Sequence, residues 1–304
     1  MKDKKAVVTG GAGFIGSHIV SELVKRGFEV HVIDNYAGGR REDRVNPKAI
    51  YHESDIRYYD EIAPIIKGAE YVFHEAALPR VQFSIENPLE TFSVNVDGLV
   101  SVLRASHEGG VKRLIYAASS SAYGDQETLP LSEELPAQPK SPYGLQKYIG
   151  EMSCRLWSEV YGLSTVSLRY FNVYGSKFDP NGPYALVIGK FLLQKSQGNP
   201  LTINGDGTHT RDFTNIRDIV SANMLAMESD NVGKGEVINI GAGRNASVNE
   251  VASMIGGPVV HVDPRLEPAH TRADNRKAKK LLGWEPTVKL EDGIAELKKE
   301  MGLL

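Results

Sequence analysis

The chain has 304 residues, enough for one large domain or two smaller ones, and its 41% hydrophobic and 24% charged residues are typical of a globular protein. A formal net charge of −3 excludes the broad basic surface that attracts nucleic acid or anionic membrane, so we expect neither as a partner. The single cysteine, Cys154, excludes an internal disulfide, and we expect it to be a core thiol.

The N-terminal stretch MKDKKAVVTGG carries positive charges, but its apolar run meets glycine too early for a signal sequence or a membrane span. A cytoplasmic location is therefore expected.

Short β-branched runs then alternate with helical patterns along the first 170 residues. Strands are predicted at 5–10, 29–34, 50–56, 70–77, 113–120 and 164–170, and helices between them at 14–26, 90–108 and 142–161. Alternation of this kind indicates βαβ crossovers and a doubly wound α/β domain, a parallel sheet covered by helices on both faces.

From about residue 172 the pattern loosens, and turn residues dominate long stretches. Only EVINIGAG at 236–243 is typical of another sheet strand. We expect a nucleotide-binding domain over 1–171, including parts of 213–242, and a smaller, partly discontinuous substrate domain over 172–304.

A glycine-rich loop follows the first predicted strand directly. In TGGAGFIGSHIV, Gly10, Gly13 and Gly16 are spaced G-x-x-G-x-x-G before an apolar helix. Such glycines allow a tight turn, and the helix N-terminus offers N–H groups and a positive dipole to a pyrophosphate. The context of strand, loop and helix predicts a dinucleotide site.

An acidic residue ends the second predicted strand. Asp34 lies 18 residues after Gly16, where a carboxylate accepts hydrogen bonds from the ribose hydroxyls of NAD and repels the 2′-phosphate of NADP. Arg40 and Arg41, which could receive a phosphate, oppose this preference. We expect NAD.

The stretch SPYGLQKYIGE predicts a helix that starts at residue 142, with Ser141 as its cap and Pro142 in its first turn. We expect its core face to hold Leu145, Tyr148, Ile149 and Met152. Tyr143 and Lys147, one turn apart, would share the opposite, exposed face.

Together, TGGAGFIG, DN at 34–35, DI at 55–56, HEAA at 74–77, AASSSAYGD at 117–125 and YGLQK at 143–147 resemble the extended short-chain dehydrogenase/reductase family, and in particular its nucleotide-sugar epimerases. The resemblance covers nearly the whole chain. It implies a Rossmann-type fold, NAD as cofactor and a nucleotide sugar as substrate.

The resemblance implies that Tyr143 and Lys147 are the catalytic pair, because a nearby ammonium stabilises the phenolate that takes a proton. It places the third catalytic residue at Ser119, four residues before Tyr123. Ser120 and Ser121 stand where related dehydratases carry acidic residues, so we expect them to contact substrate without dehydration. Tyr123 is either structural or in contact with the sugar.

The remaining cofactor contacts are also implied by the resemblance. They comprise the glycine loop with its first helical residues, the end of the second strand, the adenine-flanking pair, the diphosphate path and one buried asparagine: Gly10, Gly13, Phe14, Ile15, Gly16, Asp34, Asn35, Asp55, Ile56, Ala76, Ala77 and Asn95.

For the sugar nucleotide, the resemblance implies that Asn172 meets the diphosphate, that Arg211 and Arg265 clamp phosphate, and that Glu267 replaces an aspartate that contacts ribose. Thr271 would lie against the C2 substituent of the sugar, where a small residue admits an N-acetyl group. The uracil would lie beside Tyr184, Ala185, Leu186 and Val187.

The function implied is a UDP-sugar 4-epimerase that interconverts UDP-glucose and UDP-galactose, and UDP-GlcNAc and UDP-GalNAc, through a 4-keto intermediate. The alternatives are a UDP-glucuronate 4-epimerase or decarboxylase, and a catalytically silent NAD-sensing protein. The histidines show no spacing suited to a metal site, so no metal is expected. The resemblance also implies a homodimer, through the helices at 90–108 and 142–161.

Overall fold

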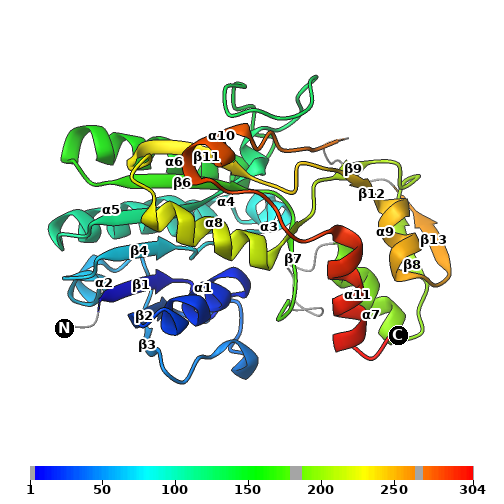
Figure 1. Cartoon of the computed structure of the whole chain (residues 1–304), viewed down its shortest axis with the longest axis horizontal. Helices are drawn as coiled ribbons and strands as arrows, with labels where there is room; N and C mark the ends of the chain where they lie inside the picture. Colours follow the sequence, from blue (N-terminus) through cyan, green and yellow to red (C-terminus); the bar gives the residue numbers. More distant parts are fainter. Residues whose placement is uncertain (1–3, 179–186, 264–269, 304) are drawn as a thin grey trace.

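The computed structural model describes residues 4–178, 187–263 and 270–303. A seven-stranded sheet, with every pairing parallel, lies at the centre of the larger unit (Figure 1). Its order is β11-β6-β5-β4-β1-β2-β3, which confirms the doubly wound, Rossmann-like fold. The strands are β1 (Lys5–Thr9), β2 (Glu29–Asp34), β3 (Ile50–Glu53), β4 (Tyr71–His74), β5 (Arg113–Ser119), β6 (Thr165–Tyr170) and β11 (Lys234–Ile240).

Helices cover both faces of this sheet. The core on one face includes side chains of α1 (Phe14–Lys25), α8 (Ile216–Glu228) and α10 (Arg276–Leu282). The core on the other face includes side chains of α2 (Tyr59–Ile66), α5 (Gly98–Glu108) and α6 (Pro142–Tyr161). Because helices cover both faces, polar residues of the inner strands are buried as well, and all six residues of β6 (TVSLRY) are buried.

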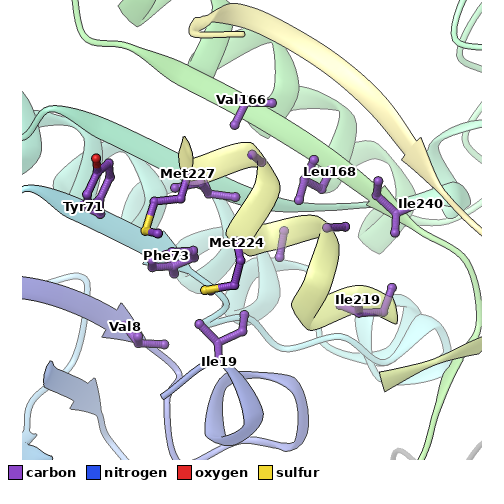
Figure 2. Close-up of a cluster of buried hydrophobic side chains, with 14 of the residues drawn as sticks. Val8, Ile19, Tyr71, Phe73, Val166, Leu168, Ile219, Met224, Met227 and Ile240 are labelled. Carbon is purple, nitrogen blue, oxygen red and sulfur yellow. The ribbon is translucent and has the colours of Figure 1, made fainter. Parts of the chain in front are cut away.

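Figure 2 shows the first of these cores, where α1 and α8 pack side by side against one face of the sheet. Phe73 of β4, Ile19 of α1 and Ile219 of α8 have no solvent-exposed surface. Burial of a side chain of this size contributes about 1.5–3 kcal/mol each. The rigid sheet that results holds the loops at its carboxyl edge in place.

The helix predicted over 90–108 is interrupted. α4 (Pro88–Phe92) is followed by a π-helical turn, η2 (Ser93–Asp97), before α5 begins. A π-turn inserts one residue into the helical ladder and is frequent at functional sites. Here it includes Asn95, which is 3% exposed.

The smaller unit lies beside the larger one (Figure 1). Its core joins residues from 174–178, 187–203, 246–255 and 290–303, together with Phe213, around a parallel strand pair. Its elements are α7 (Val187–Ser196), β8 (Leu201–Asn204), α9 (Val248–Ile255), β13 (Val259–Val262) and α11 (Leu290–Glu300).

Short elements complete the described chain: η1 (Glu42–Arg44), α3 (Val81–Glu86), η3 (Ser120–Ala122), β7 (Val173–Tyr174), β9 (Thr210–Arg211), β10 (Thr214–Asn215) and β12 (Ala246–Ser247). Across the three described ranges, no helix combines the length and apolarity needed to span a bilayer.

Candidate active site

The predicted site residues come together at the carboxyl edge of the large sheet. Parallel strands all point the same way, so the residues at their ends meet at one edge, where ligands of this fold class bind. The glycine loop follows β1, Asp34 ends β2, Glu75 follows β4 and Ser119 ends β5.

The glycine loop forms a close-fitting cradle. Gly10 has a φ of +69°, and a Cβ there would lie 2.6 Å from the backbone nitrogen of Ala76. A Cβ at Gly16 would collide with the carbonyl oxygen of Gly10. α1 begins after Gly13, which has no side chain to cap the first-turn N–H groups. Those N–H groups, of Phe14, Ile15 and Gly16, fit the pyrophosphate of NAD.

Asp34 is fixed by two backbone donors at the end of β2. Its Oδ2 accepts from the Ala12 amide at 3.0 Å, and its Oδ1 accepts from the Tyr36 amide at 2.8 Å. Burial raises the pKa of this carboxyl, against the effect of both hydrogen bonds. Arg41, considered above as a receptor for phosphate, donates from Nη2 and Nε to the carboxylate of Asp43 at 2.7 and 3.0 Å.

The predicted adenine side is linked by side-chain hydrogen bonds. Asn35 donates from Nδ2 to Asp55 at 3.1 Å, and Arg57 donates to both oxygens of that carboxylate. The bonds from Arg57 hold the pKa of Asp55 below its usual value. Ile56 is 5% exposed, and its side chain packs in the core against Gly98.

The three predicted catalytic groups lie together. Ser119 is close enough to the Tyr143 phenol to lower its pKa, against the larger effect of burial, and the Lys147 Nζ lies 6.0 Å from the centroid of the Tyr143 ring. Lys147 donates to the Ala117 carbonyl at 2.7 Å and is 4% exposed. Burial raises the pKa of Tyr143 to about 12 and lowers the pKa of Lys147 to about 8. Lys147 is therefore still cationic at neutral pH.

The predicted orientation of α6 is wrong. Leu145 and Met152 are 44% and 46% exposed, whereas Lys147 is buried against the sheet. The physical reason is the pair of glycines on the inner face. A Cβ at Gly150 would collide with the Tyr116 hydroxyl, and one at Gly144 would lie 2.7 Å from the Ser121 carbonyl oxygen. The helix start was predicted correctly, because the Ser141 hydroxyl accepts from the Gly144 amide.

The serine cluster after β5 is ordered by its own hydrogen bonds. Ser119 Oγ accepts from the amide of Ser121 at 3.2 Å and from its hydroxyl at 2.9 Å. The hydroxyl hydrogen of Ser119 is thus available to donate to Tyr143 or to a substrate oxygen. Ser120 is half-buried. Tyr123 is structural, because it is fully buried and donates to Asn239 at 2.8 Å.

Asn95 connects the π-turn to α6. Its Oδ1 accepts from the Leu78 amide at 2.8 Å, and its Nδ2 donates to Gln146 Oε1 at 2.7 Å. Gln146 in turn donates to Thr91 at 3.0 Å. This buried network fixes α6 next to Lys147 and holds the stretch that follows Ala76 and Ala77. Both alanines are half-buried, as expected of residues that line a path for a ligand.

Glu75 is a site residue that the sequence reasoning missed. Its Oε1 accepts from the Tyr170 hydroxyl at 2.9 Å, and Asn223 donates to that hydroxyl at 2.8 Å. Burial raises the pKa of Glu75 to about 7, and the positive charge of Lys147 opposes the rise. Its negative charge in turn raises the pKa of both Lys147 and Tyr143. The available signal was a carboxylate at the end of the otherwise apolar strand EYVFHEAA.

The substrate-side residues are spread over a wider area. Asn172 donates to the Asp212 carbonyl at 3.0 Å. Arg211 donates to the Thr210 carbonyl at 3.0 Å, and Val187 begins α7. Thr271 is 9% exposed, and its hydroxyl accepts from the Asp212 amide at 3.3 Å. Five further predicted contacts lie outside the described residues: Tyr184, Ala185, Leu186, Arg265 and Glu267.

Asp212 is a second missed residue, and it organises this side. Its carboxylate accepts from the amides of Ala242, Gly243 and Ala273 at 2.6, 3.0 and 2.9 Å. Burial raises its pKa to about 6 despite these bonds. The carboxylate thereby ties the end of β11 to the strand-like stretch that carries Thr271.

Comparison with known proteins agrees with this geometry. A Thermotoga maritima UDP-glucose 4-epimerase, solved with UDP-glucose, superposes with a TM-score of 0.91 at 37% identity, over 98% of this chain and 99% of that one. A UDP-N-acetylglucosamine 4-epimerase from Methanobrevibacter ruminantium, in complex with UDP-N-acetylmuramic acid, superposes with a TM-score of 0.91 at 34% identity, over 99% of this chain and 100% of that one. A UDP-glucose 4-epimerase of Corynebacterium glutamicum is 34% identical over 93% of this chain and 91% of its own.

These relatives are named for different UDP-sugars, and a UDP-glucuronic acid decarboxylase of Xenopus tropicalis is 33% identical over 96% of this chain and 71% of its own, so the similarity shows the family and leaves the reaction and the sugar open. The model of the NAD dependent epimerase/dehydratase family matches residues 6–241, which include the glycine loop, the serine cluster and α6. The chain is therefore a member of the NAD-dependent epimerase/dehydratase family, and its cofactor is NAD.

Proposed function

We propose that this enzyme is a UDP-sugar 4-epimerase that inverts C4 through a 4-keto intermediate. The observation that carries the proposal is the buried ammonium of Lys147, which lies 6.0 Å from the centroid of the Tyr143 ring and donates to the Ala117 carbonyl two residues before Ser119, beside the cofactor cradle. This arrangement can remove a proton from a sugar hydroxyl and return it. Epimerisation needs both events and no net redox change.

Tyr143 takes the proton of the sugar 4-hydroxyl, and Ser119 shares its hydrogen with the same oxygen. Lys147 stabilises the phenolate. Its ammonium keeps its charge because it donates a hydrogen bond to the Ala117 carbonyl and because the negative charge of Glu75 raises its pKa. The glycine loop at Gly10, Gly13 and Gly16 would hold NAD, which would supply the hydride acceptor and donor that inversion at C4 needs. Tyr143 then returns the proton to the 4-oxygen, so the residues end as they began.

For the sugar, we propose that UDP-GlcNAc and UDP-GalNAc are accepted beside UDP-glucose and UDP-galactose. The proposal rests on the size of Thr271 at the position expected to face the C2 substituent. Threonine is small, and its hydroxyl accepts from the Asp212 amide, which holds the side chain back against the protein. A pocket bounded by such a residue leaves room for an acetamido group.

For the assembly, we propose a homodimer formed through α4, α5 and α6. Apolar side chains on these helices and on neighbouring α3 are exposed to solvent, with Leu89 at 87%. Exposed apolar surface on this scale marks an interaction site. A second copy of the chain offers a matching face by two-fold symmetry. The exposed residues are Val81, Ile85, Leu89, Phe92, Val100, Leu145, Met152, Leu156, Val160 and Tyr161.

The test is incubation of the purified enzyme with six UDP-sugars (UDP-glucose, UDP-galactose, UDP-GlcNAc, UDP-GalNAc, UDP-glucuronate and UDP-galacturonate), followed by chromatographic separation of products. We expect interconversion of the first two and of the next two. Conversion of UDP-glucuronate alone, or its loss of CO₂, would replace the proposal with the uronate alternatives. NAD binding without turnover of any sugar would favour the NAD-sensing alternative.

A further inference from the structure

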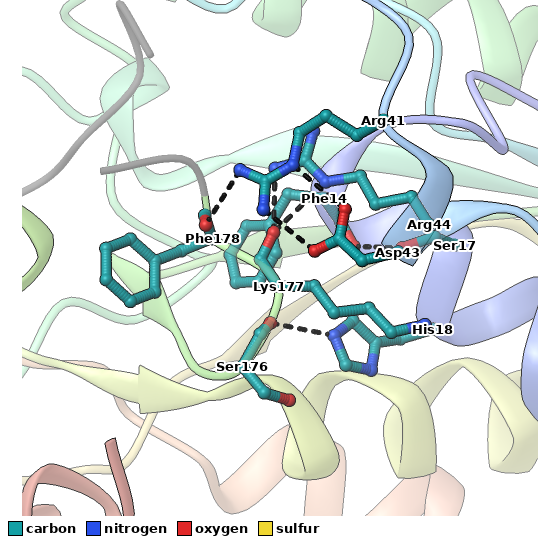
Figure 3. Close-up of polar contacts among 9 residues, drawn as sticks. All are labelled: Phe14, Ser17, His18, Arg41, Asp43, Arg44, Ser176, Lys177 and Phe178. Carbon is teal, nitrogen blue, oxygen red and sulfur yellow. Dashed lines mark hydrogen bonds and ion pairs between the residues drawn. The ribbon is translucent and has the colours of Figure 1, made fainter. Parts of the chain in front are cut away.

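Three consecutive backbone carbonyls, those of Ser176, Lys177 and Phe178, are held by side chains of the nucleotide-binding unit (Figure 3). We call residues 176–178 the tethered segment. His18 donates from Nε2 to the Ser176 carbonyl at 2.9 Å. Arg44 donates from Nε and Nη2 to the Lys177 carbonyl at 3.0 and 2.7 Å.

The third carbonyl, that of Phe178, accepts from Arg41 Nη1 at 3.2 Å. Arg41 is itself oriented by its paired hydrogen bonds to Asp43. The donors therefore come from α1 and from the turn η1 with the residue before it, Arg41, all remote in sequence from the carbonyls. Contacts from two directions fix the segment more firmly than a single contact would.

Arg44 is the strongest anchor because it is 7% exposed. Arginine is seldom buried to this extent unless it is paired, since a guanidinium loses much hydration on burial. Lys177 adopts a φ of +60°, which is uncommon for a residue with a side chain and is maintained only where surrounding contacts favour it. The structure thus uses a buried charge to fix one carbonyl in an unfavourable backbone conformation.

The tethered segment lies between two predicted substrate contacts. Asn172 precedes it by four residues, and Val187 at the start of α7 follows it by nine. The donors lie on the cofactor side: His18 is on the helix that begins at the glycine loop, and Arg44 follows Asp34 by ten residues. The tether therefore bridges the two predicted ligand sites.

We propose that Arg44, supported by His18 and Arg41, is a positioning residue for the UDP moiety of the substrate: it fixes the tethered segment so that Asn172, four residues before it, is set for the diphosphate. The inference rests on the proposed function. Arg44 acts on substrate affinity and leaves the chemical step alone, because Tyr143, Lys147 and Ser119 are anchored independently on α6 and β5.

The test compares Arg44→Met with wild-type holoenzyme by calorimetric titration with UDP and by steady-state kinetics. Methionine keeps the apolar stem and removes the donors. We expect the Kd for UDP and the KM for the UDP-sugar to rise about tenfold, because charge-assisted hydrogen bonds that order the segment are lost. We expect kcat to stay within about twofold and the bound NAD per chain to stay unchanged.

Arg26→Met is the matched control. Arg26 belongs to the same unit, but its partners are Glu22 and Glu228 at the surface, and we expect wild-type Kd and KM. His18→Phe is a second variant that keeps the ring beside Phe14 and removes the donor to Ser176. We expect a rise of about threefold from it. Arg44→Lys, which keeps one charged donor group, should fall between wild type and Arg44→Met.

A lower melting temperature in Arg44→Met and His18→Phe with unchanged Kd and KM would reduce the tether to a structural contact and overturn the inference. A fall in kcat at constant KM would overturn it as well. UDP binding by the wild type without epimerisation of any UDP-sugar would refute only the proposed function, because the calorimetric comparison does not depend on turnover. Absence of UDP binding in the wild type would refute both.

Discussion

Replacement of Lys147 by methionine tests how the buried phenol becomes a base. Burial raises the pKa of Tyr143 to about 12, so at pH 7 its ionisation costs about 7 kcal/mol with Lys147 in place, five pH units at 1.36 kcal/mol each. Removal of the Lys147 charge should raise this cost further. Lys147 Nζ lies 6.0 Å from the ring centroid, and a unit charge at this distance contributes about 3 kcal/mol at an effective dielectric constant near 20.

About 3 kcal/mol corresponds to about two pH units and a factor of about 100 in the phenolate population. We therefore expect Lys147→Met to lower kcat about 100-fold near pH 7 and to move the acidic limb of the pH profile upward by about two units. The assay is initial-rate epimerisation from pH 5.5 to 9.5, with the bound NAD per chain measured for each preparation. Lys147→Arg, which keeps the charge, should lose less activity than Lys147→Met.

The carboxylate of Glu75 provides the opposite perturbation. Because its negative charge raises the pKa of Tyr143, Glu75→Gln should move the acidic limb downward if direct repulsion outweighs the loss of support for Lys147.

A Lys147→Met variant that retains NAD and stays within tenfold of wild-type kcat, with no shift of the pH profile, would refute the electrostatic reasoning.

The other predictions concern the proton acceptor, the cofactor, the sugar and the assembly. Tyr143→Phe should keep NAD and the fold yet lower kcat by several orders of magnitude, since no other group takes the 4-hydroxyl proton; near wild-type turnover would remove Tyr143 from catalysis. Asp34→Ala should weaken NAD binding and improve NADP binding, measured by titration with each; equal affinities before and after would argue against ribose recognition by Asp34. Thr271→Tyr should suppress turnover of N-acetylated substrates by about 1–3 kcal/mol in kcat/KM and spare UDP-galactose; an equal loss on both would place Thr271 away from C2. Leu156→Asp should yield monomers in light scattering, whereas Val259→Asp, on an apolar site 42% exposed in the smaller unit, should not.

The sheet was predictable because its strands are short apolar runs set by local composition. EVHVID and TVSLRY match β2 and β6, and the glycine loop lies where a strand, a turn and a helix follow each other. The proximity of Tyr143 and Lys147 was predictable for a different reason, their fixed spacing within a recognisable set of motifs, and their catalytic role stays a prediction. Neither inference depended on contacts between distant parts of the chain.

The features that sequence could not provide are tertiary ones. The π-turn at 93–97 has no evident local signature, and its effect is to bring Asn95 to Leu78 and Gln146. The tether needs donors at 18, 41 and 44 to meet carbonyls at 176–178, and backbone carbonyls carry no sequence signal. Glu75 was visible as a charge, but its partner Tyr170 lies 95 residues away.

The reversed orientation of α6 shows why apolar periodicity was misleading there. An amphipathic helix is assumed to bury its apolar stripe in its own domain. On α6 the inner face instead carries Gly144, Gly150 and Cys154, small residues that let the helix approach β5. That close approach brings Lys147 within hydrogen-bonding distance of the Ala117 carbonyl and shields its ammonium from solvent. The apolar side chains of α6 therefore face outward, where solvent or a second chain contacts them. This outward face, which the periodicity wrongly predicts to be buried in the domain, is the face that we propose to form the dimer.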